Sequence, residues 1–298
     1  MTDVARPPAV LSVGRLYCDL IFTDVPRLPT LGTEIFAGGF GVHAGGGAYI
    51  TAAHLAALGH ASSLATMLPS SGFSDLIRGE IEASGVDLSL SASLEEAAGP
   101  QLTVSVVQDG DRAFLTKRAG PAFPPLALAE VERRGIAHIH IGELASLVAV
   151  PDIIPLARAL GVTVSLDCGW DDGLDAAAAA PLIRSVDVFL PNEAEVAALR
   201  AHGVAEPLAP LTVIKRGATG AKAVSPAGSI TVPTEPLRAV DTTGAGDAFN
   251  AGFLSAWLCA APLEACLTAG NRRGTLSVRR RGGFAPDAAA AQAGGVRD

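Results

Sequence analysis

Short runs of β-branched and aliphatic residues alternate along this chain with longer stretches rich in alanine and leucine. The alternation is clearest at residues 136–142, 162–167 and 186–191, because each of these strand-like runs is followed by a helix-like stretch. Strands and helices that alternate in this way build βαβ units around a mostly parallel sheet. The sequence therefore predicts an α/β protein whose ligand site lies beyond the carboxyl ends of the strands.

The same pattern extends towards both ends of the chain. It predicts further strands at 9–14, 61–67 and 211–217, helices at 46–58, 74–85, 247–260 and 263–279, and hairpins at 103–116 and 221–233. No shift in composition marks a linker. We therefore expect one domain over residues 1–298, with a frayed Ala/Gly-rich tail at 285–298.

Residues 20–42 interrupt the alternation. They hold two short β-type pieces around a Pro/Gly-rich turn, between the first strand and the first helix. This connection lies at the edge of the sheet where ligands bind. We expect a small β-stranded lid made of residues 20–42 and parts of 87–118. Because an exposed strand edge invites pairing, the pattern also favours a homodimer that forms through the lid.

Composition narrows the range of partners. The chain has 22 Lys and Arg against 30 Asp and Glu, a formal charge of −8, which is the wrong sign for neutralising nucleic-acid phosphates. Its apolar runs end far short of the roughly 18 residues that a membrane span needs. The first residues lack the apolar block of a secretory signal, and the four cysteines show no CxxC spacing. We expect a cytoplasmic protein with free thiols and with no nucleic-acid or membrane partner.

The segment 241–254, DTTGAGDAFNAGFL, is the most informative stretch. Gly244, Ala245 and Gly246 leave backbone N–H groups uncovered at a helix N-terminus, where they can hold an anion. Asp247 beside them can accept the proton of a hydroxyl group that attacks a phosphoryl group. A capping aspartate on a glycine turn has the same local sequence. A base next to an anion hole predicts phosphoryl transfer.

This segment resembles the carboxyl-terminal signature of the ribokinase-like (PfkB) carbohydrate kinase family, and other matches follow in the family's order over residues 9–284. The resemblance implies a three-layer sandwich with a mostly parallel central sheet and a small β lid. It also implies an enzyme that uses ATP and Mg²⁺ to phosphorylate a hydroxymethyl group of a carbohydrate or related alcohol. The sequence has neither a Walker A motif nor a dinucleotide-binding GxGxxG motif, which disfavours P-loop kinases and dehydrogenases.

The resemblance also implies roles for single residues. It places the sugar at Asp19, Gly45 and Gly46, with His43 or Tyr49 as a further polar contact, and the nucleotide at Asn192, Lys215, Gly217, Gly220 and Asn271. Glu195 would organise Mg²⁺ through water, and Asp241 would bind a monovalent cation such as K⁺. Read without the family, Asn192 and Glu195 also fit a helix-capping pair, Gly217 and Gly220 a plain hairpin turn, and Asp241 a turn residue.

Ile50 departs from the family, which has an asparagine that reaches the sugar at this position. An aliphatic side chain cannot bond a hydroxyl group, so the identity of the acceptor stays open. The candidates are a ketose or ribose, a nucleoside, a keto-deoxy acid and a phosphorylated sugar; a nucleoside kinase of the same family and a non-catalytic sugar- or nucleotide-binding relative are the alternatives. An anionic acceptor needs a fixed cation, for which the candidates are Arg15, Arg112, Lys117 and Arg118.

Three further polar residues lie on predicted central strands. His138 and His140 share one face of a strand, but no third metal ligand is placed by spacing, so we expect interior histidines. Asp167 ends the strand 162–167, and we expect it to line the nucleotide side.

Overall fold

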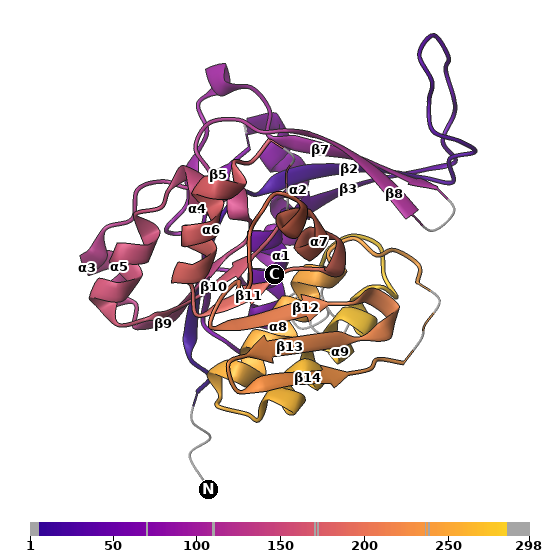
Figure 1. The fold of residues 1–298 in the computed structure, drawn as a ribbon. Coiled ribbons are helices and arrows are strands. Elements are labelled where there is room, and N and C mark those ends of the chain that lie inside the picture. Colours follow the sequence, from indigo (N-terminus) through magenta and orange to yellow (C-terminus); the bar gives the residue numbers. More distant parts are fainter. Residues whose placement is uncertain are drawn as a thin grey trace, which may run out of the picture.

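A central eight-stranded sheet organises the structure, a computed structural model that describes residues 6–69, 71–108, 111–169, 171, 173–235, 237 and 239–284. The strand order is β14-β13-β12-β11-β10-β9-β1-β4 (Figure 1). The strands are β1 (Ala9–Val13), β4 (Ser62–Ala65), β9 (Ile136–Ile141), β10 (Thr163–Asp167), β11 (Val188–Leu190), β12 (Leu211–Lys215), β13 (Ala221–Ser225) and β14 (Gly228–Val232). All neighbours from β4 to β12 pair in parallel, and only β13 and β14 pair antiparallel. The predicted mostly parallel sheet is confirmed.

Helices cover both faces of this sheet. One layer holds α1 (Gly47–Ala57), α8 (Ala245–Leu258) and α9 (Leu263–Ser277), with α8 packed between the other two. The other layer holds α3 (Leu128–Arg133), α4 (Leu144–Ala149), α5 (Ile153–Leu160), α6 (Ala176–Ser185) and α7 (Glu193–Ala201), which share one apolar cluster. The short helices α3 and α4 were not predicted, because six residues are too few to show a helical period.

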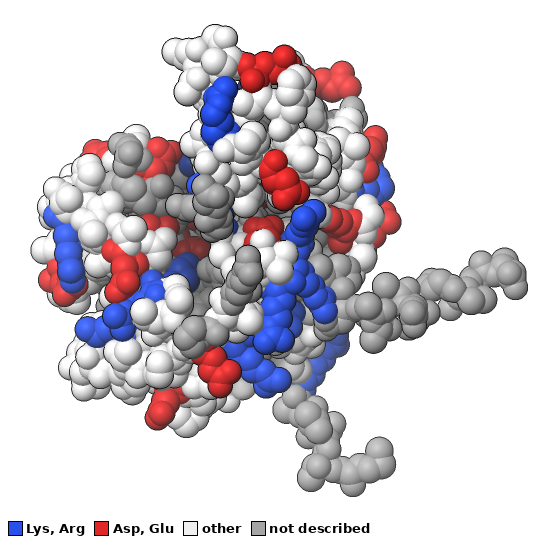
Figure 2. All heavy atoms as spheres, turned by 90° about the vertical axis from the view of Figure 1, so that its right-hand side faces the viewer, with Lys and Arg blue, Asp and Glu red and all other residues white. Residues whose placement is uncertain are grey.

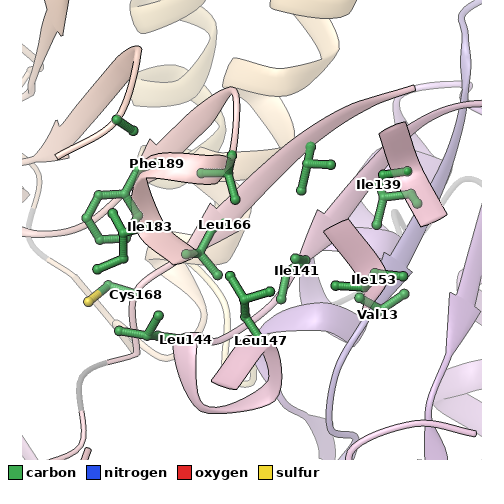
Figure 3. Packing of buried hydrophobic residues seen from close by; sticks show 14 of the residues in the cluster. Val13, Ile139, Ile141, Leu144, Leu147, Ile153, Leu166, Cys168, Ile183 and Phe189 are labelled. Atoms are coloured by element: carbon green, nitrogen blue, oxygen red, sulfur yellow. The ribbon is translucent and has the colours of Figure 1, made fainter. Parts of the chain in front are cut away.

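Alternation along β1 shows why both faces need a helical layer. Val10 packs with Leu55 of α1 and Ala251 of α8, whereas its neighbours Leu11 and Val13 pack in the cluster on the opposite face. Successive strand residues point to opposite faces, so a strand with apolar side chains on both faces must be covered twice. Figure 3 shows the cluster that contains Leu11 and Val13. In this cluster the strand residues Val13, Ile141 and Leu166 pack with the helix residues Leu144, Leu147 and Ile153.

A separate four-stranded sheet projects from the main body in the order β3-β2-β7-β8 (Figure 1). Its strands are β2 (Tyr17–Thr23), β3 (Gly39–Gly45), β7 (Leu102–Gln108) and β8 (Asp111–Lys117). β2 pairs antiparallel with β3 and parallel with β7, and β8 returns antiparallel beside β7. We call these four strands the lid sheet. Residues 87–101, part of the predicted lid, lie outside these strands, and within them β6 (Ala92–Ser93) pairs with β5 (Met67–Leu68).

The two faces of the lid sheet differ in chemistry. Strand pairing places Asp19, His43, Thr103 and Arg112 on one face. The opposite face carries Leu20, Phe22, Phe40, Val42, Val104 and Leu115. Helix α2 (Ser71–Ser84) packs against β2 and β3 at the inner end of the apolar face. The outer end of that face is exposed at Phe40 and Leu115.

Some sequence predictions lie outside the described residues: the turn at 109–110 in the predicted hairpin, and the predicted frayed tail at 285–298. Within the described part of the chain, no helix combines the length and apolar character that crossing a membrane requires.

Candidate active site

A cavity of about 590 Å³ opens beyond the carboxyl ends of the parallel strands. It is lined by the end residues of β10 and β12, by the start of α8, by α9 and by Arg112 of the lid sheet. Of the predicted site residues, these line it: Asn192, Glu195, Lys215, Gly217, Gly220, Gly244, Ala245, Gly246, Asp247 and Asn271. A cavity therefore lies at the predicted location of the site.

The predicted anion hole lies at the N-terminus of α8. Gly244 has a left-handed backbone, with φ of 70°, and its carbonyl group accepts the first helical hydrogen bond, from Ala248 N at 2.8 Å. A Cβ atom on Gly244 would lie 2.6 Å from Gly283 Cα, so both conformation and packing require glycine here. Ala245 N donates to the carbonyl oxygen of Thr242 at 3.2 Å, whereas the N–H groups of Gly246 and Asp247 have no helical acceptors. All three residues border the cavity.

Asp247 lies in the first turn of α8, on the wall of the cavity. Burial raises the pKa of this carboxyl group to about 7, and the charge of Asp167 acts in the same direction. Lys215 and Arg112 oppose the rise. A carboxylate whose pKa lies near neutrality is a suitable proton acceptor at physiological pH.

Gly47, at the start of α1, explains how Asp247 fits. A Cβ atom on Gly47 would lie 2.9 Å from Asp247 Oδ1 and 2.7 Å from the carbonyl oxygen of Gly142. The sequence analysis selected the neighbours Gly45 and Gly46 and missed Gly47. The third glycine of the GGG run was the only local signal of this close approach.

A buried ion pair lies beside Asp247. Lys215 Nζ, at the end of β12, donates to Asp167 Oδ1 of β10 at 2.7 Å, and Asn250 Nδ2 of α8 donates to Asp167 Oδ2 at 2.6 Å. Although partial burial acts in the opposite direction, the nearby carboxylates, Asp167 first, raise the pKa of Lys215. Lys215 was predicted to bind the nucleotide; it lines the cavity, but its ammonium group is held by Asp167.

The two interior histidines lie beneath this ion pair. His138 Nε2 and His140 Nδ1 both contact the hydroxyl group of Ser165, at 2.7 and 2.9 Å. Burial lowers the pKa of His138 to about 3 and that of His140 to about 4, so both rings are neutral. The structure confirms that these histidines are interior residues.

Asn192 and Glu195 form a capping box at the start of α7. The Asn192 side chain accepts from Glu195 N at 2.9 Å, and Glu195 Oε2 accepts from Asn192 N at 2.7 Å. The capping alternative is therefore correct, and both residues also line the cavity. Across the described residues, no group of three or more His, Cys, Asp or Glu side chains could hold a metal ion. Glu195 fits a metal that is held mainly by substrate phosphates and water.

Gly217, Gly220 and Asn271, which were predicted to bind the nucleotide, line the cavity. Gly217–Thr219 forms one short 3₁₀ turn between β12 and β13. Asn271 Nδ2 donates to the carbonyl oxygens of Val232 and Pro233, at 3.0 and 3.3 Å. This amide therefore ties α9 to the end of β14, a structural role that spacing did not show.

The predicted sugar-binding residues Asp19 and His43 face each other across β2 and β3. Burial raises the pKa of Asp19 to about 7. His43 Nδ1 lies 2.7 Å from Glu80 Oε1 of α2, and this contact raises the pKa of His43. Asp19 lies within β2. Glu80 was missed, because nothing in the spacing of α2 links it to the lid sheet.

Gly45 and Gly46 shape the backbone next to Asp19. A Cβ atom on Gly45 would lie 1.9 Å from Asp19 Oδ2, and one on Gly46 would lie 2.3 Å from the carbonyl oxygen of Arg15. Only glycine leaves room for the buried carboxyl group at this crossing.

Two neighbouring residues of α1 point away from the cavity. Tyr49 is 1% exposed and packs in the core with Ile77 and Ile81 of α2, so the prediction that it contacts substrate is wrong. The helical period of α1 directs this side chain into the interior. Ile50, 3% exposed, packs behind the anion hole against Gly244 and Gly283.

Of the four candidate cations, Arg112 alone lines the cavity. Its guanidinium group donates to the hydroxyl group of Thr242, in the loop before the anion hole. Arg15 is held by Gln101 and by the carbonyl oxygens of 119–121, and Arg118 pairs with Asp171. Arg112 therefore joins the lid sheet to the loop that precedes the predicted anion hole.

Asp241 links the loop before α8 to the segment around Gly282. Its Oδ1 accepts from Thr243 N at 2.8 Å and its Oδ2 from Gly282 N at 2.9 Å. The nearby hydroxyl group of Thr243 is buried and has no hydrogen-bond partner among the described residues. A carboxylate beside an unpartnered hydroxyl oxygen fits the oxygen ligands of a monovalent cation.

Comparisons with known proteins identify the family of this chain. The family model described as pfkB family carbohydrate kinase matches residues 8–289. An ATP-dependent ribose-1-phosphate kinase from Halopiger xanaduensis is 33% identical over 282 residues, which cover 92% of this chain and 93% of the relative.

Solved structures share the fold. A nucleoside kinase from Methanocaldococcus jannaschii has a TM-score of 0.76 at 20% identity, over 93% of this chain and 94% of its own. Ribokinase from Arabidopsis thaliana, complexed with ribose and ATP, has a TM-score of 0.74 at 24% identity, over the same shares of the two chains. The family consists of phosphotransferases with an alcohol group as acceptor. A match over nearly the whole length, around a cavity with the family's signature at its base, shows that this chain belongs to the PfkB family of carbohydrate kinases.

Proposed function

We propose that this protein transfers the γ-phosphoryl group of ATP to a hydroxymethyl group of a phosphorylated sugar, with ribose 1-phosphate as the first candidate. The observation that carries the proposal is Arg112, a cation that the lid sheet holds at the cavity wall. The relative named ATP-dependent ribose-1-phosphate kinase supports the same acceptor class. A guanidinium group matches the geometry of a phosphate and remains charged at any physiological pH.

The reaction uses the residues around Asp247. Its carboxylate accepts the proton of the acceptor hydroxyl group, the oxygen forms a bond to the γ-phosphorus, and the bond from that phosphorus to the β–γ bridging oxygen breaks to release ADP. The N–H groups at Gly244–Gly246 bind the negative charge that is carried by the transferring group. Glu195 would hold Mg²⁺ through water, and the ion would neutralise phosphate charge. Asp241 and the Thr243 hydroxyl group would hold a monovalent cation beside the loop.

Asp19 orients the acceptor in this proposal. It lies on the same face of the lid sheet as Arg112, and its carboxyl group can bond two neighbouring hydroxyl groups. With the phosphate at Arg112 and the hydroxyl groups at Asp19, the remaining hydroxymethyl group is directed to Asp247. The aliphatic Ile50 supports the anion hole and removes one polar contact to the sugar.

The test is ADP release from ATP and Mg²⁺ across ribose 1-phosphate, ribose, fructose, nucleosides and a keto-deoxy acid. We expect the highest kcat/KM with the sugar phosphate. Arg112→Gln should raise the KM for that acceptor about ten- to a hundredfold, the effect of losing a charge-assisted hydrogen bond, and leave the KM for ATP unchanged. Arg118→Gln is the matched control, because Arg118 pairs with Asp171 outside the cavity.

Other outcomes contradict the proposal in distinct ways. A preference for a nucleoside or a neutral sugar would assign the enzyme to another acceptor class of the family. Unchanged turnover in Arg112→Gln would show that Arg112 does not take part in recognising the acceptor. Binding of ATP without turnover of any acceptor would favour the non-catalytic alternative.

We also propose that two copies pair through the apolar face of the lid sheet. Phe40 and Leu115 on this face are 58% and 74% exposed, and the loop that joins β2 to β3 exposes Leu31 and Phe36. Exposed apolar side chains gathered in this way indicate an association surface. Phe40→Asp with Leu115→Asp should convert a dimer to a monomer in light scattering, whereas Leu76→Asp on α2, also exposed, should not. A wild-type monomer at micromolar concentration would contradict the pairing.

A further inference from the structure

Glu80 of α2, which no sequence pattern indicated, holds two adjacent residues of β3. Its Oε1 lies 2.7 Å from His43 Nδ1, and its Oε2 accepts from Ala44 N at 2.7 Å. Because β3 is an edge strand of the lid sheet, this second bond satisfies an N–H group that has no neighbouring strand on that side. Glu80 therefore fixes both the edge of the lid sheet and the ring of His43.

Glycines on the same face of β3 leave room for this ring. Gly41 and Gly45 lie two residues before and after His43, so the three residues share one face of the strand. A Cβ atom on Gly41 would lie 2.8 Å from His43 Nε2, and one on Gly282, in the main body, would lie 3.0 Å from His43 Nδ1. One on Gly45 would collide with the carboxyl group of Asp19. The ring is therefore held between the lid sheet and the segment at Gly282.

His43 and Asp19 lie side by side on this face. They are direct partners in the register of β2 and β3, which places their Cβ atoms roughly 5 Å apart. The His43 side chain is 24% exposed, and none of the described residues bonds its Nε2 atom. The contact with Glu80 raises the pKa of His43, and the charge of Asp19 acts in the same direction, which favours a proton on Nε2 as well as on Nδ1. The pair thus presents a carboxylate acceptor next to an N–H donor.

Surface charge does not by itself select a ligand on this protein. On the face shown in Figure 2, Lys and Arg side chains gather beside the central hollow, and Asp and Glu side chains lie on the same face. Both signs of charge are thus present there. Sugars of similar size differ mainly in their hydroxyl groups, and a site that bonds a hydroxyl group strongly rejects the analogue that lacks it. Selectivity among sugars therefore depends on directed hydrogen bonds.

We propose that His43 binds a hydroxyl group of the acceptor that also donates to Asp19, and that Glu80 is the positioning residue that holds His43 for this contact. A hydroxyl group has one proton and two lone pairs, so it can donate to a carboxylate and accept from Nε2–H at the same time. The acceptor class is then a sugar derivative with two neighbouring hydroxyl groups, both on Asp19 and one of them shared with His43. This inference rests on the proposed kinase function and names the part of the acceptor that the lid sheet recognises.

The contact is tested by a cycle of enzyme variants and acceptor analogues. Ribose 1-phosphate is compared with its 2-deoxy and 3-deoxy analogues by kcat/KM, from initial rates of ADP release. In the wild type, loss of the shared hydroxyl group should lower kcat/KM about a hundredfold, because two buried or fixed polar groups lose their partner. In His43→Phe the same loss should be at least about tenfold smaller, with the KM for ATP unchanged. His43→Gln, which keeps an N–H donor, should recover most of the wild-type discrimination.

Glu80→Gln tests the positioning role. The amide keeps the size of the side chain but loses the charge that favours the donating form of His43, and its single oxygen cannot serve both His43 and Ala44 N. We expect kcat/KM for ribose 1-phosphate to fall about tenfold, and the penalty for the deoxy analogue to shrink with it. Glu82→Gln, at an exposed glutamate of the same helix, is the matched control and should behave as the wild type.

The possible outcomes separate this contact from the proposed function. Equal penalties for both deoxy analogues in the wild type and His43→Phe would overturn the contact. A Glu80→Gln variant that loses the same factor with every acceptor would overturn the positioning role, because a merely structural defect does not distinguish hydroxyl groups. If another acceptor is preferred over ribose 1-phosphate, the proposed acceptor class fails, and the same cycle with that acceptor and its deoxy analogues decides the contact. Absence of turnover with every acceptor would overturn both.

Discussion

Replacing Asp247 with asparagine should lower kcat about a thousandfold, because the acceptor hydroxyl group loses the group that takes its proton. Asparagine keeps the size and the hydrogen-bonding shape of the side chain. We therefore expect the KM values for ATP and acceptor to change only a few fold. Initial rates of ADP release measure the effect. Asp152→Asn, at an exposed carboxylate before α5 that makes no capping hydrogen bond, should keep the wild-type rate.

The Asp247→Asn variant should also be more stable than the wild type at alkaline pH. Burial raises the pKa of Asp247 to about 7 from an ordinary value near 3.8, so the ionised form is the costly one in the folded state. The wild type loses stability as the pH rises from about 4 to about 7, and the asparagine variant does not. The gap in Tm should be largest above pH 7, about 5 °C or more, and should disappear near pH 4. A variant that is inactive and also less stable at pH 8.5 would indicate a structural role for Asp247.

Replacing Lys215 with methionine should have the second largest effect. It leaves the buried carboxylate of Asp167 without its cation, and breaking a buried pair in this way costs about 3–5 kcal/mol. The Tm should fall by about 10 °C. Because Lys215 lowers the pKa of Asp247, its loss should also move the acid limb of the kcat profile to higher pH.

A double variant separates the two consequences. Asp167→Asn combined with Lys215→Met removes both charges, so most of the lost stability should return. Thermal unfolding and pH–rate profiles are measured for the wild type, Asp167→Asn, Lys215→Met and the double variant, which together form a double-mutant cycle. An acid limb that stays in place in Lys215→Met would show that the ammonium group does not act on Asp247.

The parts of the site that could be predicted from sequence are local ones. The predicted anion hole and its base lie in four consecutive residues, and the helix after a glycine turn fixes their relation. Asn192 and Glu195 are three residues apart on one helical turn, so their contact also follows from spacing. The central strands were predictable for the same reason, because apolar runs of five or six residues between helices have one interpretation.

The remaining parts depend on contacts between distant segments. Asp167 and Lys215 meet because β10 and β12 flank β11, and no single segment carries that pairing. Glu80 reaches His43 because α2 packs on the lid sheet. Tyr49 was assigned to the substrate from its neighbours in sequence, whereas the orientation of α1 about its own axis directs this side chain into the core. Sequence spacing describes one segment at a time, and these side chains depend on the packing of two.

The two-faced lid sheet has a consequence for how this protein can vary in length. Side chains alternate along β8, so a slip of one residue against β7 would move Arg112 to the apolar face and carry Leu115 towards the cavity. Insertions or deletions within the paired strands are therefore compatible with activity only in even numbers. The loop between β2 and β3 lies outside the pairing and has no such constraint. Variation in lid length should accumulate there, where it changes neither face.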